Sequence, residues 1–263
     1  MQIHDHNLIK SLAENGKTPI QISKELNIKY SSVTYILQKY SIYYRSNQGN
    51  IRYFQNIDSA TKAYLLGFIA ADGYIVRSNS SSVTLGIQIN RVDTEVLELL
   101  RQEIGCEKVL TFPNNEMVRF TLSNPLLVND LLNLGITQRK SKTLTNILLN
   151  IPNEFHGSFI SGYLDGDGCI HVSNNPNITT IRVSIRGTEE LLKGIADSLN
   201  LQNYSLFFNK TWILSFAKKE EVYKFYLIYN NSPFKLTRKI NKFNQGIEKL
   251  ILKYPKVQTI SSS

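Results

Sequence analysis

The chain has 263 residues, enough for one large domain or two medium ones, each with a hydrophobic core of its own. Apolar residues make up 42% of the chain and charged residues 19%, proportions that argue against intrinsic disorder. The formal net charge of +9 favours a polyanionic partner.

The sequence has the features of neither a membrane protein nor a secreted, disulfide-stabilised one. No apolar run approaches the roughly 20 residues that span a bilayer. The N-terminal residues MQIHDHNLIK lack the basic, then apolar, then small pattern of a signal peptide. Two cysteines, Cys106 and Cys169, are too few for a disulfide framework and lack the spacing of zinc ligands. We therefore expect an intracellular protein, in the cytoplasm, the nucleoid or an organelle.

Residues 1–45 are predicted to form a small all-α module of three short helices. The first helix is expected over residues 6–15 and the second over residues 19–26, where Thr18 is the N-cap and Pro19 the first helical residue. The third helix is expected to run to about Tyr40.

The third of these helices has a buried stripe and a polar, aromatic and basic outer face. Ser32, Tyr35 and Lys39 lie outside the apolar stripe. The arrangement resembles a helix-turn-helix DNA-binding module, whose last helix enters the major groove. The alternative is a helical cap that packs on the main domain.

Residues 46–56 are predicted to be a basic linker, rich in Arg, Ser, Asn, Gln and Gly. Arg45 and Arg52 could follow a phosphate backbone or enter a minor groove. A solvated tether is an equally good interpretation of this composition.

An internal repeat dominates the remaining sequence. The segment LLGFIAADG at residues 65–73 recurs as ISGYLDGDG at residues 160–168, and the offset from Gly67 to Gly162 equals that from Asp72 to Asp167. Each copy is predicted to run helix, strand, strand, helix, strand, strand, helix. Residues 57–150 and 151–263 therefore predict an α+β fold of two pseudo-symmetric αββαββα repeats.

The repeated helices are apolar almost all round and must be buried. Gly67 and Gly162 would let two such helices pack closely, which compensates for the cost of glycine inside a helix. Each helix ends in Asp-Gly, and we expect Gly73 and Gly168 to adopt the left-handed conformation that often ends a helix.

An aspartate at a helix C-terminus lies at the negative end of the dipole, and two such aspartates near one axis would repel each other. Divalent cations would relieve both effects. We expect Mg²⁺ or Mn²⁺ at a site made by Asp72 and Asp167, with Ala71 and Gly166 beside them. The alternative is that Asp-Gly merely forms a turn after each helix.

The two repeated segments resemble the signature of the LAGLIDADG homing endonucleases in their two-motif, monomeric form, over roughly residues 57 to 250. The resemblance implies a monomer with no small-molecule cofactor, in which a saddle of strands straddles double-stranded DNA. It also implies a metal-dependent, staggered double-strand cut at a long, near-palindromic site, with Asp72 and Asp167 as catalytic metal ligands.

The same resemblance places a catalytic basic residue after the last helix of each repeat. Lys140 matches this position in the first copy and Lys239 in the second. Lys142 competes with Lys140, and strict application of the repeat offset would select Lys235 in the second copy.

The strands after each motif alternate apolar residues with Arg, Gln, Asn, Ser and Thr, and acids are absent from these stretches. Such side chains hydrogen-bond base edges in a major groove. Asp165, whose counterpart is Ala70, is either a turn-former or a residue that tunes the second site. The strand residues expected to contact DNA are Arg77, Thr84, Gln88, Asn90, His171, Arg182, Ser184 and Arg186.

A second hypothesis is a DNA-binding regulator, or an RNA maturase, with the same fold and no cleavage. The two motif acids, Asp72 and Asp167, favour cleavage over this alternative. The ends of the sequence lack the residues that intein splicing needs, so an intron-encoded or free-standing enzyme is expected.

Overall fold

The computed structural model describes residues 6–15, 17–40, 49–77, 83–138, 140–173, 180–255 and 257, with only the backbone of Ser141. The chain divides into two compact units: one contains residues 1–56 and 75–133, the other residues 57–74 and 134–263. Arg45 lies outside the described residues. No helix among those described is long and apolar enough to cross a membrane.

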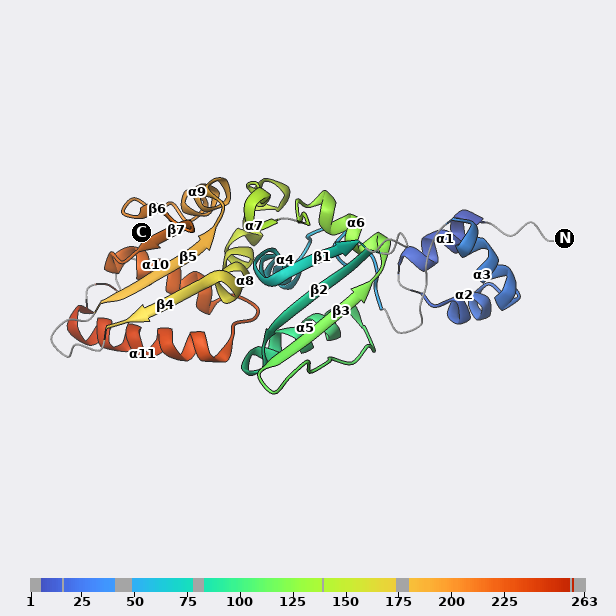
Figure 1. Ribbon diagram of the computed structural model, residues 1–263, viewed down its shortest axis with the longest axis horizontal. Helices are drawn as coiled ribbons and strands as arrows, with labels where there is room; N and C mark the ends of the chain where they lie inside the picture. The colour runs from blue at the N-terminus through green and yellow to red at the C-terminus, as the bar shows by residue number, and fades with distance from the viewer. Residues whose placement is uncertain are drawn as a thin grey trace. The chain divides into compact units, whose positions relative to one another are not determined.

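The first unit begins with the three expected helices, α1 (His6–Glu14), α2 (Pro19–Glu25) and α3 (Tyr30–Lys39) (Figure 1). Thr18 caps α2 in a capping box with Gln21, and Pro19 opens the helix as predicted. The three helices share a core that includes Ile9, Ile22 and Val33. Leu126 packs against the same core, so the helical module also contacts the rest of its unit.

Residues 49–56, the described part of the predicted linker, are not the solvated tether that their composition allowed. Ile51 and Phe54 are buried, and the partly buried Arg52 donates from Nη1 to Oδ1 of Asp130 at 2.7 Å. Burial raises the pKa of Asp130 to about 6, although the nearby Arg52 acts to lower it. Arg52 therefore helps to hold the segment on its own unit, a role different from the expected one on DNA.

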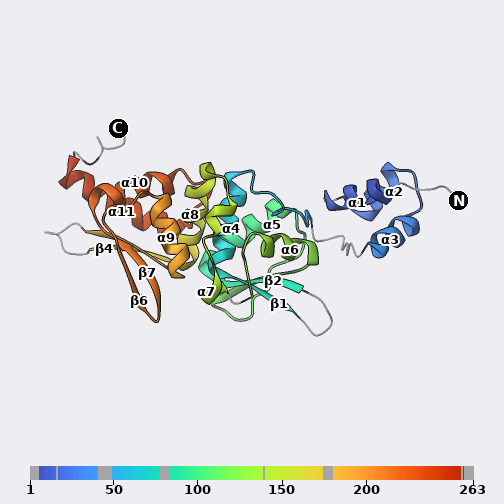
Figure 2. The ribbon, with the colours of Figure 1, turned by 90° about the horizontal axis from the view of Figure 1, so that it is seen from above.

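The first unit contains a three-stranded sheet in the order β1-β2-β3, with β2 antiparallel to β3. Figure 2 shows α5 and α6 on one face of this sheet. The elements are β1 (Gly73–Arg77), β2 (Val83–Asn90), η1 (Arg91–Asp93), α5 (Thr94–Ile104), β3 (Met117–Ser123) and α6 (Pro125–Asn133).

The prediction of four strands per repeat is wrong for the described part of the first copy. The strand expected before β3 is reduced to one bridge, between Thr111 and Arg119. Beyond this bridge, the next hydrogen bond to β3 would need the backbone N–H of residue 113. Residue 113 is a proline, which has no N–H to donate. A full strand therefore does not extend from this bridge toward the turn.

The described part of the second copy, which lies in the second unit, shows the expected order of elements followed by one additional helix. Its sheet has the order β4-β5-β7-β6 with antiparallel neighbours, and Figure 2 shows α9, α10 and α11 on one face of it. The elements are α4 (Ala60–Asp72), α7 (Lys140–Thr143), η2 (Ile147–Asn150), η3 (Asn153–Phe155), α8 (His156–Asp167), β4 (Gly168–Val172), β5 (Ile181–Gly187), α9 (Glu189–Ser198), β6 (Ser205–Asn209), β7 (Thr211–Phe216), α10 (Lys219–Asn230) and α11 (Thr237–Lys253).

Helices α4 and α8, which carry the two motifs, pack against each other in the second unit. A Cβ on Gly67 would lie 2.0 Å from the carbonyl oxygen of Phe159, and one on Gly162 would lie 1.9 Å from that of Tyr64. The two backbones are therefore in direct contact at both glycines. This contact groups α4 with the second repeat, although it belongs by sequence to the first.

The prediction of left-handed glycines after the motif helices is wrong. Gly73 has φ −70° and Gly168 has φ −109°, because β1 and β4 begin at these residues without a turn. Glycine is required there for space instead. A Cβ would lie 2.6 Å from the carbonyl oxygen of Ile69 at Gly73 and 2.6 Å from that of Leu164 at Gly168.

The direct backbone contact predicts a large effect of one methyl group at Gly162. Gly162→Ala should lower the free energy of unfolding by roughly 3 kcal/mol and Tm by roughly 10 °C, because the helices must separate. Gly157→Ala in the same helix is the control, since its Cβ would meet no backbone atom of another element and only one side-chain methyl group, Cγ2 of Ile228, at 2.8 Å. Equal Tm values for the two variants in thermal unfolding would contradict the close-packing argument.

Candidate functional site

The two motif aspartates lie at the C-terminal ends of α4 and α8, where the helices touch. A Cβ on Gly166 would lie 2.3 Å from Cβ of Ala71 and 2.9 Å from Oδ2 of Asp72. Asp72 therefore lies against the residue that precedes Asp167. Two partly buried carboxyl groups are brought together here by one helix contact.

Each of these helix ends is bound by a lysine ammonium group of the same unit. Nζ of Lys140 donates to the carbonyl oxygens of Ala70, at 2.8 Å, and Ala71. Nζ of the buried Lys239 donates to the carbonyl oxygens of Leu164, Asp165 and Gly168, at 2.5, 2.7 and 2.8 Å.

These two lysines place a positive charge at the C-terminal end of each motif helix. A cation at the C-terminus of a helix offsets the negative end of the dipole, and Lys140 and Lys239 provide one at each end. The fold therefore supplies its own compensation. In addition, the carbonyl oxygen of Ala71, expected in the metal site, accepts a hydrogen bond from Lys140.

The structure also separates the competing lysines. Nζ of Lys235 donates to the carbonyl oxygens of Asn230 and Ser232, at 2.7 and 2.9 Å, in its own loop. Lys142 lines a different cavity, beside Thr188 and Trp212. Lys140 and Lys239 are thus the pair that meets the motif helices.

Burial and charge act in opposite directions on this group. Burial lowers the pKa of Lys140, whereas Asp167 and Asp72 raise it. Burial also raises the pKa of Asp167, and Lys140, Lys239 and Arg186 lower it. Lys140 therefore lies within electrostatic reach of both aspartates, and Asp167 also lies within reach of Lys239 and of Arg186 on β5.

Asp165 is neither a turn-former nor a second carboxylate of this site. It is buried, and its Oδ1 accepts from the Tyr229 hydroxyl at 2.6 Å. Its Oδ2 accepts from the Tyr64 hydroxyl at 2.6 Å and from the backbone N–H of Leu236 at 3.0 Å. Asp165 therefore links α4, α8 and α10 to the start of α11. Its partners are remote in sequence, so no local pattern indicated them.

The donor set fits a divalent cation that also binds a phosphate group. Within the described residues, no three His, Cys, Asp or Glu side chains form a cluster able to hold a metal. Mg²⁺ and Mn²⁺ are bound by one or two carboxylates, with water and phosphate oxygens completing the coordination. Asp72 and Asp167 provide the two carboxylates. Water and phosphate oxygens would complete the coordination, because the described residues form no cage of protein ligands alone.

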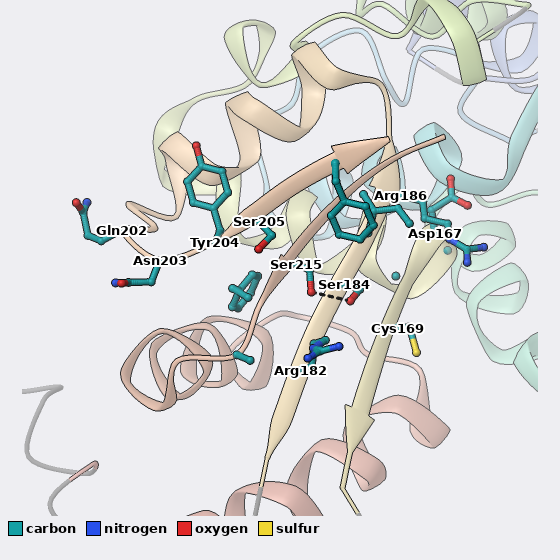
Figure 3. Close-up of a pocket in the computed structure, with 16 residues that line it drawn as sticks. Asp167, Cys169, Arg182, Ser184, Arg186, Gln202, Asn203, Tyr204, Ser205 and Ser215 are labelled. Atoms are coloured by element: carbon teal, nitrogen blue, oxygen red, sulfur yellow. Dashed lines mark hydrogen bonds between the residues drawn. The ribbon is translucent and has the colours of Figure 1, made fainter. Parts of the chain in front are cut away.

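A groove of about 1100 Å³ runs along the second sheet and ends at Asp167 (Figure 3). Arg182, Ser184 and Arg186 of β5 line it, as their alternation predicted. The hydroxyl oxygens of Ser184 and Ser215 lie 3.1 Å apart, which joins β5 to β7. The other lining residues are Gly166, Gly168, Cys169, Gln202, Asn203, Tyr204, Ser205, Phe207, Ile213, Phe216 and Ala217.

Residues on the first sheet form pairs across neighbouring strands. Oε1 of Gln88 accepts from Nε of Arg119 at 2.7 Å, and the hydroxyl oxygens of Thr84 and Ser123 are 2.7 Å apart. Asn90 caps η1, since its Oδ1 accepts from the backbone N–H of Val92 at 3.1 Å. This cap is a role that the alternation in β2 did not indicate.

Arg77 is the last residue of β1, so its expected DNA contact remains a prediction. In β1, Gly73 and Ile75 are buried while Tyr74 and Val76 are exposed. Arg77 shares the phase of Ile75, and it is exposed because the strand ends there.

The remaining predicted DNA-binding residues lie at accessible positions. His171 of β4 is exposed and pairs with Arg182 across the strands. On α3, Tyr35 is exposed and Ser32 is partly exposed, outside the core of the helical module.

Several residues of both outer faces were not singled out from the sequence. Arg119 is one, although the alternation of β3 is regular and would have indicated it. On β6 and β7 one face carries Ser205 and Ser215 together with the apolar Phe207 and Ile213. The sequence of these strands therefore shows no alternation of polar and apolar residues.

The three hydrogen bonds from Lys239 predict a structural cost for its loss. Lys239→Met should lower the free energy of unfolding by about 3 kcal/mol and Tm by roughly 9 °C, because two buried carbonyl groups and one partly buried one lose a charged donor. Lys242→Met, at an exposed position of α11, is the control. A Tm like that of the unmodified protein would show that these bonds contribute little.

No protein-family model matches the sequence, and no curated protein matches it. Solved structures do match. The I-LtrWI LAGLIDADG homing endonuclease bound to target DNA aligns with 79% of this chain and 93% of its own, with a TM-score of 0.53 and 14% identity.

Two further structures give the same result. The LAGLIDADG meganuclease I-AabMI, bound to uncleaved DNA, covers 75% of this chain and 96% of its own, with a TM-score of 0.55 and 13% identity. I-SmaMI, bound to an uncleaved DNA target with calcium ions present, covers 74% and 92%, with a TM-score of 0.50 and 14% identity. The present chain therefore has the fold of the LAGLIDADG homing endonucleases.

Proposed function

We propose that the protein is a site-specific DNA endonuclease that cuts both strands of a long target with the help of Mg²⁺ or Mn²⁺. The observation that carries this proposal is the position of Asp72 and Asp167 at two touching helix ends, with Asp167 at the end of a groove lined by arginines. The similar structures described above include several bound to DNA, which supports the same partner.

The proposed reaction is hydrolysis of one phosphodiester bond in each strand, giving a staggered break. Asp72 and Asp167 would hold the metal against the scissile phosphates. The bound metal would supply Lewis acidity and lower the pKa of a water molecule. Overall, one water is consumed per strand: its oxygen would bond to phosphorus, one backbone P–O bond would break, and the leaving oxygen would end as a hydroxyl by taking up a proton from solvent in exchange for the one the water releases.

The lysines act in this proposal as positioning residues. Lys140 holds carbonyl groups at the end of α4 and Lys239 holds those at the end of α8, so each would fix the helix end that carries one of the two aspartates. Arg186, which lines the same groove as Asp167, would bind a backbone phosphate.

The sheet faces would read the target. Arg182, Ser184 and His171 on the second sheet, and Gln88 with Arg119 on the first, carry groups that hydrogen-bond base edges. The two faces differ in composition, so the target is proposed to be near-palindromic with unequal halves.

Replacing either motif carboxylate tests the cleavage proposal. Asp72→Asn and Asp167→Asn should each bind the target with nearly normal affinity but lose cleavage by at least roughly a hundredfold, because an amide holds a divalent metal poorly. Asp197→Asn, at an exposed position of α9, is the control. Binding is measured by fluorescence anisotropy, and cleavage is measured in Mg²⁺ and in EDTA.

Full cleavage by either variant would exclude the metal-ligand assignment. Cleavage by none of the proteins, with binding intact, would favour a second candidate: a DNA-binding regulator or an RNA maturase without cleavage. One observation supports this candidate, because Lys140 and Lys239 satisfy the helix ends without a metal.

We also propose that the helix-turn-helix module, α1–α3, binds DNA on one flank of the target. Tyr35→Ala should weaken binding about tenfold on a duplex that includes this flank, because Tyr35 is exposed on the proposed recognition helix. It should leave binding unchanged on a duplex cut short on that side. Leu8→Ala, on α1, is the control. Equal effects on both duplexes in anisotropy titrations would contradict a flank contact.

A further inference from the structure

The groove face of the second sheet contains two apolar side chains among polar and basic ones. Ile213 of β7 pairs with Phe207 of β6 on one side and with Arg186 of β5 on the other. The neighbouring row of the same face is entirely small and polar: it consists of Cys169, Ser184, Ser215 and Ser205.

Phe207 and Ile213 do not belong to the core of the unit. The opposite face of these strands is the buried one, where Leu214 and Ile185 pack beneath the helices. Phe207 is 45% exposed, and Ile213 is partly exposed in the groove. Side chains directly opposite each other in an antiparallel pair have Cβ atoms about 5 Å apart, so the two form one small apolar surface.

The surroundings of this surface select a polyanionic occupant with an apolar group. Among the residues that line the groove, Arg182 and Arg186 are the cations, and Asp167 at the far end is the acid. Figure 3 shows Arg182 and Arg186 on the same strand with Ser184 between them. An apolar peptide or a neutral ligand would leave both guanidinium groups without a counter-charge.

We propose that Phe207 and Ile213 recognise the C5-methyl group of a thymine in the major groove of the target. This inference rests on the proposed function and names one base that the second sheet reads. The thymine methyl is the apolar group on the major-groove edges of the four bases. The row of Phe207, Ile213 and Arg186 matches it, with an apolar contact beside a cation that binds a phosphate or a guanine.

The geometry also assigns a position to this thymine. Arg186 and Asp167 line the same groove, and Figure 3 shows both side chains at one end of it, so the row begins near the proposed cleavage site. Phe207 lies on β6, the outermost strand of the sheet. The recognised base pair is therefore in the half of the target that the second unit contacts. The neighbouring row of Cys169, Ser184, Ser215 and Ser205 would contact the adjacent base pair.

Removing single methyl groups from the DNA tests this inference. A target is first selected by binding from a randomised duplex library in EDTA. Each of its thymines is then replaced singly by uracil, which removes the methyl group and keeps the hydrogen-bonding edge. At one position in one half of the target, uracil should weaken binding by the unmodified protein roughly fourfold, the effect of one buried methyl group.

Variants of the protein then show which side chains contact the thymine methyl group. In Phe207→Ala and Ile213→Ala, the same uracil substitution should have little or no further effect, because the apolar contact is already lost. Phe208→Ala is the matched control: Phe208 is adjacent on β6, is 66% exposed, and lies on the opposite face. This control should keep the fourfold uracil effect. Because Phe207 is exposed, its variant should keep a Tm close to that of the unmodified protein.

The outcomes separate this inference from the proposed function. Tight, selective binding with no uracil effect at any position would overturn thymine recognition and leave DNA binding intact. A uracil effect that persists in both Phe207→Ala and Ile213→Ala would also overturn it, because other residues would then contact the methyl group. A library that yields no enriched sequence would contradict the proposed function itself, and this inference with it.

Discussion

The contact between the backbones of α4 and α8 is the constraint on which the rest of the second unit depends. Gly67 and Gly162 leave no room for a side chain, because a Cβ at either residue would overlap a carbonyl oxygen of the other helix. Close packing of this kind is intolerant of added volume. It brings the ends of both helices together, and so determines where Asp72 and Asp167 lie.

The same contact creates an electrostatic problem that the fold solves with its own cations. Two negative helix ends and two aspartates meet in a partly buried place, where charges interact more strongly than in water. Lys140 and Lys239 donate hydrogen bonds to the last carbonyl groups of both helices. In our proposal the aspartates are thereby held ready for a metal and a phosphate, rather than depending on the metal for their position.

The buried Asp165 shows how far the two copies have diverged around a shared framework. Its counterpart is Ala70, yet it binds the hydroxyl groups of Tyr64 and Tyr229 and anchors the start of α11. Loss of one partner of such a buried network leaves polar groups unsatisfied, which costs more than the bond itself. The second copy therefore carries a structural role in its motif that the first copy lacks.

The sequence by itself determined the periodic features: the three N-terminal helices, the repeat, the buried motif helices, and the outward phase of Arg182, Ser184 and Arg186 on β5. These depend on spacing along the chain, which a sequence displays directly. Only the tertiary structure decided which lysine meets which helix end, that Arg52 pairs with Asp130, that Gly73 and Gly168 are extended, and that Asp165 is buried. In each case the deciding partner lies far away in sequence or the available space is set by packing, and neither leaves a local pattern.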